Sequence, residues 1–344
     1  MAYGFLAAHV VFGVAAVTIY MVWVLVIDGP HVFATVSRTY LDPDERAARA
    51  PLLRGSLAFF ALGPATVALA ALLGTRLPYD VFLAVCTAWA YWHVVRQHYG
   101  VMVLYERKAA EDARLDDRVD AAFLYAGLLA PVVAFACGNE RTLALVGLDA
   151  PPAWAPAVAL IAWSVVAAAG VALALRQLVR ARAGLPIHGT KLAFLVAATS
   201  VSAVLFSSPV AARIQYEAIV PIVTSFHDVQ YLAIVWFFHG NRLADRRRRR
   251  LAVPFFVRHG ALFLAAGVAF TLAYRVGLGC LFSAWPGCDV GAETVALPAG
   301  LTLSDLGVAF LWGFALHHYY LDQRIWHVRR EPAVGRALRL PDAA

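Results

Sequence analysis

Long apolar runs separated by short polar segments dominate the chain. Nine of these runs approach the roughly 20 residues that a helix needs to cross a bilayer. They cover residues 5–27, 55–75, 80–103, 120–137, 153–176, 191–208, 216–238, 254–276 and 300–322. The sixth is short and ends at Ser207, Ser208 and Pro209. The pattern predicts an all-α, polytopic transmembrane helical bundle of about nine spans.

Composition supports a membrane protein. Of the 344 residues, 61% are hydrophobic and 15% are charged, whereas a soluble domain carries about 25% charged residues. No fixed-period repeat or low-complexity linker divides the chain, so we expect a single integral membrane domain over 1–330 and a cytoplasmic tail over 331–344. The net charge of +7 does not indicate a nucleic-acid partner, because the basic run Arg246–Arg250 directly follows an apolar run, as cytoplasmic anchoring residues do.

Basic residues alternate along the loops. They are enriched after the first, third, fifth and seventh runs, and cytoplasmic loops carry the excess of Lys and Arg. This predicts an N-terminus outside, a C-terminus inside and a location in a bacterial inner membrane. Cys280 and Cys288 then lie outside, where a disulfide can persist, although two unpaired thiols are equally compatible with the sequence.

Polar side chains interrupt several of the predicted spans. In "YWHVVRQHYG", residues 91–100, two histidines and an arginine stand where lipid favours apolar residues. Ionisable groups inside a membrane are costly and mark functional sites, and neutral imidazole is the commonest metal ligand. With His31 just past the inner end of the first span, four spans bring histidines to one depth in the inner half. The predicted metal ligands are His31, His93, His98, His227, His317 and His318. Hydrogen bonds between helices are the structural alternative.

Spacing limits how these histidines can act together. His93 and His98 diverge by about 140° on an ideal helix, and His317 and His318 by about 100°. His93 and His98 can share an ion only if their helix is locally distorted, and two ions are the alternative. Candidates for further ligands, or for partners that orient the imidazoles, are Asp28, Gln97, Asp228, His239 and Asp322; Arg96, Tyr99 and Tyr231 are candidates for substrate contact or charge pairing.

Two resemblances follow from these residues. "HVVRQH" followed far downstream by "HH" resembles the histidine boxes of membrane fatty-acid desaturases and hydroxylases, with one histidine, in "FHDVQY", where their middle box has more. The layout of many spans with histidines inside helices is similar to that of the Brp/Blh-type carotene-cleaving membrane dioxygenases. The first resemblance implies two irons near the cytosolic face, and the second implies non-haem iron held by histidines from several helices.

The sequence therefore predicts a metal-dependent oxidoreductase that uses dioxygen. We expect a non-haem iron oxygenase, hydroxylase or desaturase with one or two iron ions, ahead of copper or zinc. Its expected partners are the lipid bilayer, a lipophilic small-molecule substrate, dioxygen and an electron donor. One alternative is a haem-binding electron-transfer protein. The other is a transporter in which His and Asp relay protons or metal ions.

Overall fold

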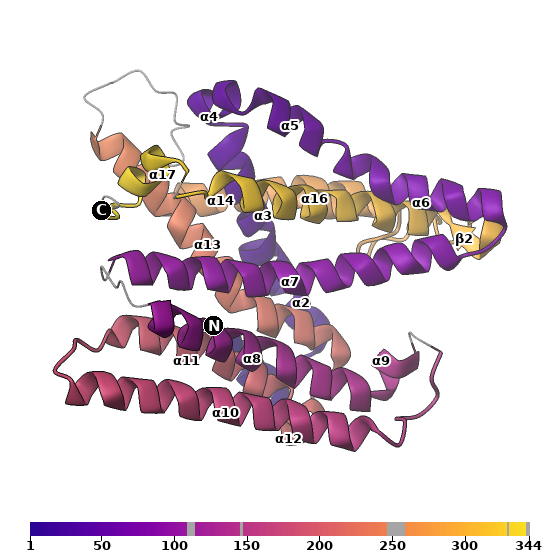
Figure 1. Cartoon of the computed structure of the whole chain (residues 1–344). Helices are drawn as coiled ribbons and strands as arrows, with labels where there is room; N and C mark the ends of the chain where they lie inside the picture. Colours follow the sequence, from indigo (N-terminus) through magenta and orange to yellow (C-terminus); the bar gives the residue numbers. More distant parts are fainter. Residues whose placement is uncertain (109–113, 145–146, 246–258, 329, 342–344) are drawn as a thin grey trace. The chain divides into compact units, whose positions relative to one another are not determined.

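The computed structural model describes residues 1–108, 114–144, 147–245, 259–328 and 330–341. Within them the chain is almost entirely helical (Figure 1), and the sheet found there is a two-stranded hairpin of β1 (Ala296–Leu297) and β2 (Leu301–Thr302). The all-α class is confirmed. The arginine run Arg246–Arg250 and the first residues of the predicted span 254–276 lie outside the described residues.

Six helices in the described residues are long and apolar enough to cross a membrane, which indicates a membrane-embedded protein. They are Ala16–Thr39, Ala50–Leu73, Leu115–Gly138, Ala155–Arg182, Tyr216–Arg242 and Gly260–Leu281. Length and composition do not support the predicted count of nine. The predicted spans 80–103 and 300–322 lie in long helices that carry histidines and charges, and 191–208 corresponds to a helix of 17 residues.

The first helix long enough to cross a membrane begins later than predicted. Helix α1 (Ala2–Val10) ends before Gly13, which has a φ of +68° that favours glycine, and the membrane-length helix starts at Ala16. It comprises α2 (Ala16–Trp23), the π-helical η1 (Val24–Asp28) and α3 (Gly29–Thr39). His31 was expected just beyond the end of this span and instead lies within it.

Contacts group the described chain into two compact units. The first comprises 1–21 and 94–227, and the second comprises 22–93 and 228–344. The borders fall inside α2, α7 (Leu77–Lys108) and α13 (Tyr216–Asp245).

The first unit is built around α8 (Arg114–Gly138), which packs against α10 (Ala155–Arg182) and α11 (Gly189–Leu205). The short helices α9 (Glu140–Ala144) and α12 (Ser208–Ala211) complete it. Buried ion pairs link these helices: Asp116 accepts from Arg176 and Arg180, and Lys191 Nζ lies 2.5 Å from Asp120 Oδ2. The apolar faces thus pack while the charges near the helix ends neutralise one another.

The second unit pairs α6 (Phe59–Leu73) with α16 (Leu303–Ile325), and α3 with α14 (Gly260–Thr271). Both pairs approach closely at glycine: a Cβ on Gly63 would meet the Ala309 carbonyl oxygen at 2.0 Å, and one on Gly29 would meet Thr271 Oγ1 at 1.9 Å. The remaining elements are α4 (Pro43–Ala48), α5 (Ala50–Ser56), η3 (Leu272–Leu278), α15 (Gly279–Leu281), η4 (Pro298–Gly300) and α17 (Pro332–Ala337).

The ends of α16 are both anchored. Its first turn has a capping box in which Thr302 and Asp305 exchange hydrogen bonds, and a disulfide joins Cys280 of α15 to Cys288 in the segment before α16. Beyond its last turn, Val334 and Ala337 of α17 pack on Phe238 of α13, so the predicted tail contains a docked helix. This anchoring fixes the helix that carries His317, His318 and Asp322.

Candidate metal centre

Three buried imidazoles and a buried carboxylate meet in the second unit. His31 comes from α3, His93 from α7, and His318 and Asp322 from α16. Their exposed fractions are between 1% and 8%. His318 and Asp322 are four residues apart and therefore project from the same face of α16. We call His31, His93, His318 and Asp322 the ligand group.

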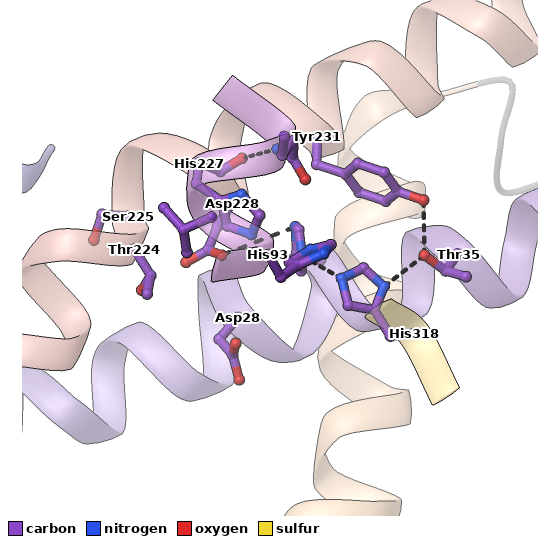
Figure 2. Close-up of polar contacts among 12 residues, drawn as sticks. Asp28, Thr35, His93, Thr224, Ser225, His227, Asp228, Tyr231 and His318 are labelled. Carbon is purple, nitrogen blue, oxygen red and sulfur yellow. Dashed lines mark hydrogen bonds and ion pairs between the residues drawn. The ribbon is translucent and has the colours of Figure 1, made fainter. Parts of the chain in front are cut away.

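The potential donor atoms of the ligand group face one another. Asp322 Oδ2 lies 3.6 Å from His318 Nε2 and 3.9 Å from His93 Nε2, and His31 Nε2 lies 2.7 Å from His318 Nε2. One donor atom from each of His93, His318 and Asp322 lies within 4.8 Å of the others, so these three could hold one metal ion. Figure 2 shows His93 and His318 side by side.

The hydroxyl groups of Thr35 and Tyr231 form hydrogen bonds with the ligand group. Thr35 Oγ1 lies 2.7 Å from His318 Nδ1, 2.8 Å from Asp322 Oδ1 and 2.7 Å from the hydroxyl of Tyr231 (Figure 2). Tyr231 also donates to Asp322 Oδ1. Asp322 Oδ1 thus accepts two hydrogen bonds, whereas Asp322 Oδ2 forms none within the described residues.

Asp228 lies next to the other ring nitrogen of His31, and Trp23 lies next to Asp228. His31 Nδ1 lies 3.9 Å from Asp228 Oδ1, and the indole of Trp23 donates to Asp228 Oδ2 at 2.9 Å. A carboxylate behind an imidazole is a common way to orient a metal ligand, which is the role predicted for Asp228. Neither Trp23 nor Thr35 was predicted from the sequence, although Thr35 is four residues after His31 and so shares its helix face.

The two adjacent histidines of α16 have different surroundings. His318 belongs to the ligand group, whereas His317 Nε2 lies 2.9 Å from the hydroxyl of Tyr40. The two rings stack with centroids 5.6 Å apart, and the Tyr40 hydroxyl also donates to the Leu53 carbonyl. The 100° rotation between neighbours on a helix explains why the two imidazoles meet different partners.

His98 and His227 belong to the first unit. Their rings are nearly parallel, with centroids 6.2 Å apart, and His98 Nδ1 lies 3.0 Å from the Val94 carbonyl. Gln97, expected beside a ligand side chain, donates to the backbone carbonyl of His227 at 2.8 Å. Arg96 donates a hydrogen bond to the hydroxyl of Tyr125, and its guanidinium lies over the ring of Tyr99. Its positive charge is therefore next to two aromatic side chains.

The remaining candidates lie in the second unit and have other partners. Asp28 lies 3.7 Å from Arg275 Nη2, which makes it an ion-pair carboxylate. His239 Nε2 lies 3.5 Å from Ser37 Oγ, and its ring contacts Phe238. Among the predicted supporting residues of the second unit, Asp228 and Tyr231 contact the group and Asp322 belongs to it.

Comparisons with known proteins identify no relative of this chain: no protein-family model, curated protein or solved structure matches it. The resemblances to the desaturases and to the carotene-cleaving dioxygenases are neither supported nor refuted by them and stay predictions.

Proposed function

We propose that the ligand group binds a metal ion and that the protein is a membrane-embedded non-haem iron oxidoreductase. The observation that carries the proposal is the donor set of His93, His318 and Asp322, with Asp322 Oδ2 facing both imidazoles. Two histidines and one carboxylate, with open positions, are typical of non-haem Fe(II) oxygenases.

Burial supports a cation at this place. Three imidazoles and a carboxylate with exposed fractions of at most 8% are expensive to remove from water unless charge and lone pairs find partners. Imidazole lone pairs and one carboxylate oxygen suit iron, copper or zinc, whereas magnesium and calcium prefer all-oxygen sites. His31 is the natural fourth ligand, because its Nε2 lies beside that of His318.

The reaction that we propose is dioxygen-dependent oxidation of a lipophilic substrate. A metal would supply dioxygen activation when bound, while the surrounding apolar helices would keep water from the site and face the lipid in which such a substrate dissolves. Cleavage of a carbon–carbon double bond into two carbonyls uses both oxygen atoms and no outside electrons. Hydroxylation or desaturation instead requires two electrons from a donor, so the two classes differ in their need for a partner.

Metal analysis of the purified protein tests the proposal. We expect about one iron per chain by mass spectrometry, without the Soret band of haem. His93→Ala and Asp322→Ala should lose the iron, whereas His259→Ala, which removes an exposed histidine outside the group, should retain it. A Soret band would favour the haem alternative, absence of metal would favour a transporter, and full occupancy in both ligand variants would refute the site.

Activity requires a second experiment with chosen probes. The iron-loaded protein in detergent should consume dioxygen in the presence of an unsaturated acyl lipid or a carotene, and Asp322→Ala should not. Consumption with the carotene alone, without a reductant, would favour double-bond cleavage. Consumption that needs a reductant would favour hydroxylation or desaturation. A loaded protein that consumes no dioxygen with either probe would count against an oxygenase while leaving the metal site in place.

The proposal includes a topology. We propose that α7, α11 and α16 also cross the membrane, which gives nine spans with the N-terminus outside and the C-terminus inside, in the inner membrane of a bacterium. A reporter fused after Ala344 should be cytoplasmic, and one inserted between Cys280 and Cys288 should be outside. Both reporters on the same side would refute this orientation.

A further inference from the structure

The hydroxyl of Thr35 touches two members of the ligand group at once. It lies 2.7 Å from His318 Nδ1 and 2.8 Å from Asp322 Oδ1, and its residue has no exposed surface. Thr35 is in α3, whereas both partners are in α16. One side chain thus joins the helix that carries His31 to the helix that carries His318.

A bound metal requires Asp322 as a carboxylate and His318 as a neutral imidazole, and these protonation states set the direction of the hydrogen bonds. A carboxylate only accepts, so Thr35 and Tyr231 each donate their single hydroxyl proton to Asp322 Oδ1. Thr35 has then no proton left for His318 and must accept one from it. In that state His318 carries its proton on Nδ1, and its Nε2 presents a lone pair.

We propose that Thr35 is a positioning residue that prepares two metal ligands together. By accepting from Nδ1 it selects the His318 tautomer that coordinates through Nε2. By donating to Oδ1 it directs Asp322 to coordinate through Oδ2. This inference rests on the proposed metal site and adds a residue outside the set predicted from the sequence.

The chain offers a closely matched control. Thr39 is also fully buried in α3, one turn further on, but its hydroxyl donates to the backbone carbonyl of Thr35 at 2.6 Å and touches no ligand. Thr35→Val and Thr39→Val each remove one buried hydroxyl at nearly constant volume. A purely structural role predicts similar effects of the two substitutions, whereas a positioning role does not.

The test is titration of the metal-free protein with Co²⁺, followed by its visible absorption, which reports affinity and coordination without dioxygen chemistry. Loss of an outer partner of a ligand typically costs about 10- to 100-fold in metal affinity, so we expect that loss for Thr35→Val with an altered cobalt spectrum. Thr35→Ser, which restores the hydroxyl, should bind within about threefold of the unmodified protein. Thr39→Val should keep both the affinity and the spectrum.

The outcomes separate this inference from the proposed function. If the unmodified protein does not bind Co²⁺, the metal site itself is refuted. If it binds and Thr35→Val binds equally well, only the role of Thr35 is refuted. Should Thr35→Val fail to purify as a monodisperse protein, Thr35→Ala replaces it, and an affinity equal to that of Thr35→Ser would overturn the inference.

Discussion

Two buried polar clusters in the second unit resolve the cost of burial in opposite ways. In the first, which we call the Glu45 cluster, one carboxylate is shared by Arg38, Arg49 and Arg242. Glu45 Oε2 lies 2.6 Å from Arg38 Nη1 and 2.8 Å from Arg49 Nε, and Glu45 Oε1 lies 3.8 Å from Arg242 Nη1. Arg38 has no exposed surface and stacks 3.9 Å from the centre of the Phe238 ring. Here the protein supplies both signs of charge.

The ligand group contains a carboxylate but no arginine or lysine. Its carboxylate, Asp322, has histidines as its ion-pair neighbours within the described residues, and neutral imidazoles bring lone pairs rather than positive charge. Hydroxyl groups occupy Asp322 Oδ1, while Asp322 Oδ2 remains directed at the imidazoles. The Glu45 cluster thus contains its own counter-charges, whereas the donor atoms of the ligand group could hold a cation.

Metal removal should therefore separate the two clusters most strongly. A ligand that binds only the folded protein stabilises it by about 4 kcal/mol when its free concentration is about 1,000 times Kd. We expect a chelator to lower the thermal unfolding midpoint of the metal-loaded protein and to leave Asp322→Asn nearly unchanged. Glu45→Gln should keep its response to the chelator. A response of equal size in Asp322→Asn would show that the metal stabilises the protein elsewhere.

Removing the shared carboxylate is the second test. Glu45→Gln leaves Arg38 buried without its counter-charge, and breaking a fully buried pair costs about 3–5 kcal/mol. Glu45 is partly exposed, so we expect a smaller loss of about 1–3 kcal/mol. Thermal unfolding of the metal-free protein measures it. Asp44→Asn is the control: its carboxylate is about half exposed and lies 3.2 Å from Arg242, so it should cost less than about 1 kcal/mol. Equal losses would remove the distinction between the two carboxylates.

Much of the fold was predictable because apolar runs directly encode membrane helices. The predicted run 153–176 corresponds to α10 (Ala155–Arg182), and 216–238 corresponds to α13 (Tyr216–Asp245). The predicted start of the first span was wrong because hydropathy does not detect the backbone break at Gly13. Polar positions in α7 and α16 include His93, His318 and Asp322, so the residues that identify the site also lower the apolar character expected of a span.

The site was predictable as a set of residue types but not as a set of contacts. Buried His93, His318 and Asp322 could be nominated because ionisable groups in apolar helices are costly. The distinction between His317 and His318 requires the rotation of α16 against its neighbours, which the sequence does not contain. Thr35 and Trp23 carried no signal, because hydroxyl and indole groups are common in apolar helices and only the packed structure shows what they touch.

Acidification tests the Glu45 cluster specifically. Burial by itself would raise the pKa of Glu45, but the guanidinium groups of Arg38 and Arg49 outweigh it and hold the pKa below its ordinary value of 4.5. A carboxylate with a lowered pKa contributes stability that is fully present above its unfolded-state pKa and is lost as the pH falls through the folded-state pKa. The difference in unfolding midpoint between the unmodified protein and Glu45→Gln should therefore shrink as the pH falls below about 4.5. A difference that stays constant down to pH 3 would show that charge does not account for it.

We expect the smallest effect at His317, which is adjacent to His318 in the sequence but lies outside the ligand group. His317 was predicted as a ligand, yet its Nε2 faces the hydroxyl of Tyr40, so His317→Phe removes a hydrogen bond with a net value of about 1 kcal/mol. The aromatic replacement can keep the stacking on Tyr40, and that hydroxyl retains the Leu53 carbonyl as its acceptor. We expect Co²⁺ affinity to change by less than about twofold, because the supporting contacts that control affinity surround His318. Thermal unfolding and Co²⁺ titration of this variant, beside His318→Phe, measure the contrast between two adjacent residues. A tenfold loss of affinity in His317→Phe would return His317 to the ligand set and require α16 to present both imidazoles to the metal.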